Sequence, residues 1–172
     1  PTINNLNSLA YGNGVYVAAG SGGVVCTSTD ATTWFTRTPF IGGSGGNPIS
    51  FGNGLFVGVS SSGYIATSTD GLGWQAQSSG STSNLLGSVY GTAYIVGGTG
   101  GLIESSTNAI TWTARTSNTA SQVNSLTYGT VHLYGTNGGG LGTSTDGTTW
   151  TARTSNTASN ILALTYGTVY VY

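Results

Sequence analysis

Short segments in which apolar and polar residues alternate recur along the whole chain, bounded by glycine, asparagine or aspartate. In the first forty residues these segments are 7–11, 15–18, 23–27 and 34–37. Alternation with a period of two, in β-branched and aromatic residues, is typical of half-buried β-strands. Asn13-Gly14 and Asn53-Gly54 separate the first and second segments and predict type I′ hairpins, because both residues accept positive φ. Since no segment has a helical period, we expect an all-β chain.

The four-segment unit repeats along the chain, and two sets of residues mark its period. The tryptophans are Trp34, Trp74, Trp112 and Trp150, spaced 40, 38 and 38 residues apart. The aromatic–glycine pairs are Tyr11-Gly12, Phe51-Gly52, Tyr90-Gly91, Tyr128-Gly129 and Tyr166-Gly167. Four strands per ~40 residues are typical of a β-propeller blade, with a stacked β-solenoid as the alternative. We place the repeats at about 6–42, 43–81, 82–119 and 120–157, with a partial fifth at 158–172. Residues 1–172 are then a single propeller domain or a propeller fragment.

A polar Ser-Thr-Asp or Ser-Thr-Asn turn precedes each of these tryptophans. The Asp or Asn side chain can accept backbone N–H bonds from residues ahead of it, which forms an Asx-turn. The tryptophan that follows can pack a large apolar surface between neighbouring sheets. We therefore expect structural roles for Asp30, Trp34, Asp70, Trp74, Asn108, Trp112, Asp146 and Trp150.

Residues 68–74 and 144–150 resemble the Asp-box, also called the BNR repeat. The first repeat has Ala31 where the box usually has glycine, and the third has Asn108 and Ala109. In that family the box joins the third and fourth strands of a propeller blade at the periphery. The family includes sialidases, other glycoside hydrolases, sortilin-like receptors and photosystem assembly factors. The resemblance implies a β-propeller of four-stranded Asp-box blades, with four complete repeats plus a partial fifth, and it specifies fold better than function.

The chain carries very little charge, which argues against two classes of partner. Charged residues make up 4% of the chain, lysine is absent, and the formal net charge is −1. Binding to nucleic acid or to an anionic membrane surface depends on clustered cations, so we expect neither. No apolar run approaches the ~18 residues of a membrane span, so we expect no membrane insertion. By association with its uncharged polar composition, we expect an extracellular or virion-surface location.

The residues that could perform chemistry have structural explanations in the repeat. His132 stands where other repeats have an aromatic residue, and the three aspartates belong to the box turns. Glu104 is the one acid outside these turns. Glycoside hydrolysis uses two carboxylates that face one sugar, so Glu104 lacks the partner that this reaction needs. The three arginines each follow a box tryptophan by three residues, so they occupy one repeated position rather than forming a sialidase-type triad. We therefore expect no catalytic residue, no metal site, no cofactor and no enzyme activity.

Binding is the function that the composition favours. Aromatic faces, amides and hydroxyls repeated in each blade suit carbohydrates, and repeated weak sites gain avidity for multivalent glycans. Residues 113–121 recur unchanged as 151–159, and the candidate ligand residues in and beside them are Asn118, Asn156, Arg115 and Arg153. A connecting role alone is the alternative for these loops. We expect a non-enzymatic repeat scaffold of a secreted or virion-surface protein, used for structural display or adhesion, with glycans as partners.

Two other functions remain open at this stage. One is a fragment of a sialidase-like Asp-box glycoside hydrolase. The other is a self-assembling extracellular subunit that pairs through its open blade edge, with another copy or with further blades of the same chain. The second follows from the partial fifth repeat, because an unpaired strand edge readily pairs with another strand.

Overall fold

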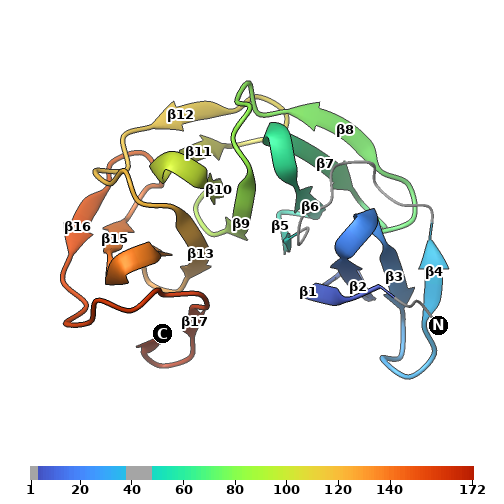
Figure 1. Ribbon diagram of the computed structural model, residues 1–172. Coiled ribbons are helices and arrows are strands. Elements are labelled where there is room, and N and C mark those ends of the chain that lie inside the picture. Colours follow the sequence, from blue (N-terminus) through green and yellow to red (C-terminus); the bar gives the residue numbers. More distant parts are fainter. Residues whose placement is uncertain (1–3, 38–47) are drawn as a thin grey trace.

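The computed structural model describes residues 4–37 and 48–172 as an arch of antiparallel β-sheets. Within this part of the chain there are four four-stranded sheets, or blades, and one two-stranded sheet. In each blade the strands follow one another in sequence order from the concave side of the arch to its outside (Figure 1). This arrangement is a β-propeller, as the repeat length predicted. The predicted boundary between the first two repeats, at 42/43, lies outside the described residues.

The strands are as follows. The first blade has β1 (Leu6–Gly12), β2 (Val15–Gly20), β3 (Val25–Ser28) and β4 (Phe35–Arg37). The second has β5 (Ile49–Gly52), β6 (Leu55–Val59), β7 (Tyr64–Ser68) and β8 (Gln75–Ser78). The third has β9 (Leu85–Tyr90), β10 (Tyr94–Gly98), β11 (Ile103–Ser106) and β12 (Thr113–Arg115). The fourth has β13 (Val123–Tyr128), β14 (His132–Thr136), β15 (Leu141–Ser144) and β16 (Thr151–Arg153). The partial blade has β17 (Thr165–Tyr166) and β18 (Tyr170–Val171).

The tight hairpins predicted from Asn-Gly pairs are present. Asn13 and Gly14 have φ of 49° and 78°, and Asn53 and Gly54 have φ of 46° and 80°. Positive φ at both central residues is the type I′ geometry that matches the twist of paired strands. The turns therefore set the register of β1 with β2, in which Tyr11 pairs with Tyr16.

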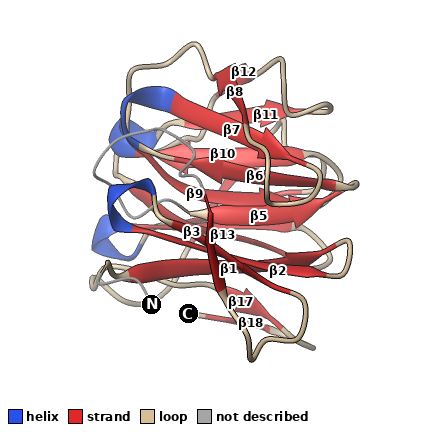
Figure 2. Ribbon diagram, turned by 90° about the vertical axis from the view of Figure 1, so that its right-hand side faces the viewer, coloured by secondary structure: helices blue, strands red, loops and turns tan. Residues whose placement is uncertain are grey.

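A short 3-10 turn follows the second strand of each complete blade, which the sequence did not predict. The turns are η1 (Ser21–Gly23), η2 (Ser61–Gly63), η3 (Thr99–Gly101) and η4 (Asn137–Gly139). Figure 2 shows them on one side of the molecule. They delay the third strand, which in the first blade begins at Val25 rather than at residue 23. In the described part of the chain, no helix has the length and apolarity needed to cross a membrane.

The core lies between the blades. Each apolar cluster at a blade junction combines residues of two neighbouring sheets, such as Val17 and Val25 of the first blade with Phe56 of the second. Similar clusters join the second to the third blade and the third to the fourth. Ile161 and Leu133 belong to a smaller cluster that joins the partial blade to the fourth. Because these clusters among the described residues each join two adjacent blades, packing between neighbours shapes the arch.

Candidate functional site

The Asp-box turn has the expected Asx-turn geometry in all four blades. In the fourth blade, Asp146 Oδ1 accepts the backbone N–H groups of Thr148 at 2.8 Å and Thr149 at 3.1 Å. Ser144 Oγ also donates to Asp146 Oδ1, at 3.0 Å. The corresponding acceptors are Asp30 for Thr32 and Thr33, Asp70 for Leu72 and Gly73, and Asn108 for Ile110 and Thr111. Each box joins the third and fourth strands of its blade.

These hydrogen bonds keep the box carboxylates ionised. Those from the backbone N–H groups of Thr33 and Thr32 lower the pKa of Asp30, and those from Leu72 and Gly73 lower the pKa of Asp70. For Asp146, the Thr148 hydroxyl is the main cause of the lowered pKa, followed by backbone N–H groups. Hydrogen bonds that favour the charged form of a carboxyl group stabilise it as an anion. The outside of the arch therefore carries fixed negative charges at neutral pH.

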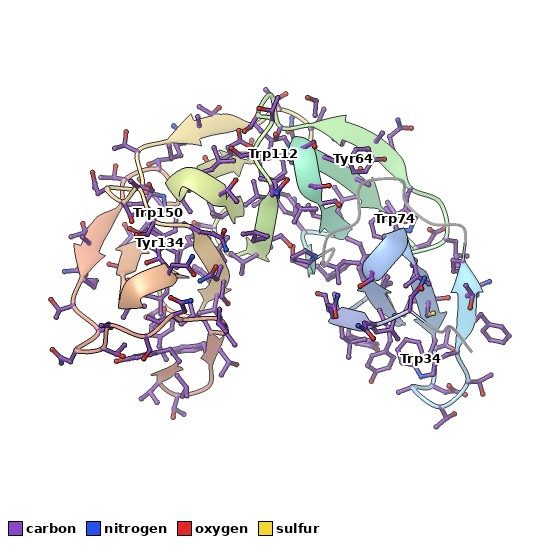
Figure 3. All side chains as sticks on the ribbon, viewed as in Figure 1. Trp34, Tyr64, Trp74, Trp112, Tyr134 and Trp150 are labelled. Carbon is purple, nitrogen blue, oxygen red and sulfur yellow. The ribbon has the colours of Figure 1, made fainter. Side chains whose placement is uncertain are left out.

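Three of the four box tryptophans, Trp74, Trp112 and Trp150, lie at junctions between described blades, and Trp34 lies at the end of the arch (Figure 3). Trp74 packs against the cluster that joins the first two blades, and Trp112 against the cluster that joins the second and third. Trp150 is buried, with its ring centroid 5.2 Å from that of Tyr134. Trp34 is half-exposed, because no described blade precedes the first one.

The three arginines occupy one repeated position, as their spacing predicted. Each Nε donates to a hydroxyl of the neighbouring strand; the pairs are Arg37 with Thr27 at 2.7 Å, Arg115 with Ser105 at 2.7 Å and Arg153 with Thr143 at 2.8 Å. Gln77 replaces the arginine in the second blade and donates to Thr67 Oγ1 at 3.3 Å. The arginines therefore lie on separate blades and do not converge on one site.

Asn118 and Asn156, predicted as candidate ligand residues, both have φ of 61° in the loop after the fourth strand of a blade. Asn118 Nδ2 donates to the backbone carbonyl of Trp150 at 2.6 Å. This bond connects the loop that follows the third blade to the box of the fourth, so the Asn118 amide nitrogen has a structural partner. Asn156 is exposed.

A polar groove lies between the third blade and the box of the fourth. It has a volume of about 310 Å³ and is lined by Thr92, Ala93, Ser105, Ser106, Thr107, Asn108, Thr111, Thr113, Arg115, Asp146 and Thr148. A second groove of about 350 Å³ shares Arg115 and Thr148 with it and also includes Asn118. Seven of the eleven lining residues of the first groove carry a hydroxyl group, and one cation and one anion accompany them. We call this first hollow the third–fourth groove.

The repeated positions at the other junctions are less polar. Between the first and second blades, Phe35 and Leu72 stand where the third–fourth groove has Thr113 and Thr148. Between the second and third blades, Ile110 stands at the position of Thr148. Among the three junctions between the complete blades that the structure describes, the third–fourth junction alone combines hydroxyl residues at both positions with an arginine. This difference between junctions could be read from the sequence once the facing positions are known.

Two further ionisable side chains, His132 and Glu104, are buried. Burial lowers the pKa of His132 to about 4, so the ring is neutral at pH 7, and its Nε2 lies 3.0 Å from Thr92 Oγ1. Its ring packs against that of Tyr128 at an interplanar angle of 51°, with the centroids 4.6 Å apart, in the aromatic row that the sequence predicted. Glu104 is buried, and burial raises the pKa of its carboxyl group. Across residues 4–37 and 48–172, no three His, Cys, Asp or Glu side chains group as metal ligands.

Comparison with solved structures supports the propeller fold. YCF48 bound to D1 peptide matches with 17% identity and a TM-score of 0.63, over 88% of this chain and 53% of that chain. The GH74 enzyme of Niastella koreensis matches with 24% identity and a TM-score of 0.64, over 88% of this chain and 24% of that one. The computationally designed Ika4 protein matches with 14% identity and a TM-score of 0.68, over 84% of this chain and 92% of that one.

The chain thus spans about half the length of the YCF48 chain that it matches. No curated protein matches it. Residues 2–124, more than half of the chain, match the family model described as the DUF6242 beta propeller domain. Together with the observed blades, this match means that the chain belongs to the DUF6242 β-propeller domain family.

Proposed function

We propose that this propeller is a non-enzymatic binding module of a secreted or virion-surface protein and that its third–fourth groove binds carbohydrate. The observation that carries the proposal is the lining of that groove, in which hydroxyl groups surround one guanidinium and one carboxylate. A sugar presents many hydroxyl groups, each of which can donate and accept a hydrogen bond. The hydroxyl groups of Thr92, Ser105, Ser106 and Thr148 bond to neighbouring side chains. The hydroxyl groups that can both donate to and accept from a ligand are therefore those of Thr107, Thr111 and Thr113.

Arg115 supplies the charged donors of the proposed site. Its Nε–H is used by Ser105, so the terminal nitrogens of the guanidinium are the donors that a ligand would meet. Hydrogen bonds from a charged donor are about twice as strong as those between neutral groups. Asn108 adds an amide where the other boxes have a carboxylate, which lowers the negative charge of the groove.

The acids of the groove favour binding over hydrolysis. Glycosidases place two carboxyl groups about 5–10 Å apart on either side of the scissile bond. Asp146 is the one carboxylate in the lining, and it is held ionised by Thr148. Glu104 is buried outside the lining. The hydrolase alternative, to which the match with the GH74 enzyme gives some weight, therefore lacks a second carboxylate at this site.

The proposal is tested by measuring the binding of a panel of neutral and acidic oligosaccharides by calorimetry or glycan array. Arg115→Gln should weaken binding at least tenfold, because it removes the charge and most of the donors. The fold should tolerate this change, since Gln77 makes the same bond to a strand hydroxyl in the second blade.

Arg153→Gln is the matched control. It removes an arginine with the same hydroxyl contact, on β16, outside the third–fourth groove, and binding should stay within about twofold. Equal loss in both variants, or no binding by any oligosaccharide of the panel, would refute the site. Release of product from fluorogenic glycosides would instead support the hydrolase alternative.

A further inference from the structure

The third blade and the box of the fourth border a second polar hollow beside the third–fourth groove. It has a volume of about 350 Å³ and is lined by Ala114, Arg115, Thr116, Asn118, Thr148, Thr149 and Trp150. We call it the Asn118 groove. Arg115, from the third blade, and Thr148, from the fourth, also line the third–fourth groove. The two hollows therefore adjoin, and these two side chains lie at their shared boundary.

Asn118 presents an amide group of fixed orientation to the Asn118 groove. Its Nδ2 donates to the backbone carbonyl of Trp150 at 2.6 Å, across the blade junction. An asparagine amide has a carbonyl oxygen and two N–H donors, and this bond uses one donor. Because Asn118 is exposed, the oxygen and the second donor can meet a ligand in an orientation that is already set.

The backbone of this loop does not require asparagine. Asn118 has φ of 61°, and Gly80, at the same position of the loop after the second blade, has φ of 83°. Glycine adopts positive φ without steric cost, and asparagine tolerates it because its short polar side chain can hydrogen-bond locally. Glycine alone would satisfy the turn, so what the asparagine contributes is its amide. The junction between the second and third blades has no such amide at Gly80.

Two adjoining hollows suit a ligand made of linked units. Each groove is at the lower end of the range of about 300–1,000 Å³ that is typical of small-molecule pockets. Once one unit of a chain occupies the first hollow, the next unit meets the second hollow at a high effective concentration. Contacts that are weak in each hollow therefore add up for a linked ligand.

We infer that the third–fourth junction binds an oligosaccharide rather than a single sugar, with adjacent units in the third–fourth groove and in the Asn118 groove. Arg115 lies where the two units join, so its guanidinium can donate to both. The second unit meets the amide of Asn118 and the hydroxyl groups of Thr116 and Thr149. The inference rests on the proposed carbohydrate function and specifies the length of its ligand.

Calorimetry with three series of linear oligosaccharides tests the inference. The probes are cello-oligosaccharides, chito-oligosaccharides and oligogalacturonates of one to four units, so neutral, amide-bearing and acidic sugars are all represented. Affinity should rise at least tenfold from one unit to two or three and then level off, because both hollows are then filled. Arg115→Gln should weaken the binding of every length, because Arg115 lines both grooves.

Asn118→Gly separates the two hollows. Glycine accepts the positive φ of this position, and the variant should weaken the binding of three units at least fivefold while that of one unit stays within about twofold. Asn156→Gly is the matched control, because Asn156 has the same φ of 61° in an identical nine-residue sequence and lines neither groove. It should leave the binding of every length within about twofold.

Thr149→Ala shows whether the effect comes from the ligand or from the lost bond to Trp150. This variant retains the bond between Asn118 and Trp150, and the second blade has Gly73 at the same position, so the box tolerates a small residue. It should also weaken the binding of three units more than that of one. Affinity that does not depend on length, or an equal loss for one unit and for three in both variants, would overturn the inference and leave the proposed function intact. Absence of binding by any sugar would overturn both.

Discussion

Replacing Gly91 with alanine tests a contact that recurs at the blade junctions, in which the glycine of an aromatic–glycine pair lies under the aromatic ring of the next blade. The new Cβ would lie 2.2 Å from Cδ2 and 2.4 Å from Cγ of Tyr128. Carbon atoms in contact normally lie about 3.5–4.0 Å apart, so the ring or the whole fourth blade must move by more than an ångström. Because these atoms are at the base of the ring, a rotation of the Tyr128 side chain cannot relieve the clash easily.

The expected cost follows from what surrounds the Tyr128 ring. The His132 ring packs against it in a tilted arrangement with ring centroids 4.6 Å apart, and His132 is itself fully buried. Overpacking of a well-filled core costs about 1–3 kcal/mol. We expect the upper part of that range because His132 prevents the Tyr128 ring from moving away from the new methyl group. Urea unfolding followed by tryptophan fluorescence should then have a midpoint roughly 1 M lower, for a slope of about 2–3 kcal/mol/M.

Gly73→Ala is the matched control for Gly91→Ala. Gly73 also lacks positive φ, and a Cβ there would meet no atom within 4 Å, so stability should change by less than about 0.5 kcal/mol. Adding Tyr128→Leu to Gly91→Ala should recover part of the loss, because the smaller side chain leaves room for the methyl group. Equal midpoints for the two glycine variants would refute the role assigned to the contact.

Two further predictions concern buried ionisable groups. Because burial holds the folded-state pKa of His132 at about 4, below the 6.5 expected when unfolded, the urea midpoint should fall as pH drops from about 6.5 to 4. His132→Phe, which copies Phe56, should flatten that dependence between pH 7 and pH 5, and an unchanged slope would contradict the assignment. Glu104 has a carboxyl oxygen, Oε2, with no hydrogen-bond partner among the described residues, and burial raises its pKa. Glu104→Gln should therefore stabilise the protein by about 1 kcal/mol at pH 7, with the gain vanishing below pH 4, where the carboxyl group is protonated; no gain at pH 7 would show that the charge is compensated.

Features that depend on residues close in sequence could be predicted. The Asn13-Gly14 hairpin needs two residues that accept positive φ, and the box turn needs an acceptor two or three residues before its donors. The repeat itself showed that Arg115 shares a structural position with Gln77. These predictions hold because the same local geometry is repeated along the chain.

Features that depend on pairs across a junction could not be predicted. The partner of Asn118 is the carbonyl of Trp150, 32 residues later, so nothing near Asn118 in the sequence identifies it as a structural residue. The third–fourth groove combines Arg115 with Asp146, which become neighbours only once the blades pack. The 3-10 turns were also missed, because a turn of three residues such as Ser21–Gly23 is too short to show a period.

The duplicated loop also connects neighbouring blades in the same way each time. Tyr134 Oη donates to the carbonyl of Ser117, and Tyr172 Oη donates to that of Ser155, across the next junction along. The donor and the acceptor of this bond both recur 38 residues along the chain. An in-frame duplication of that length would therefore carry with it the bond that anchors the connecting loop to the next blade.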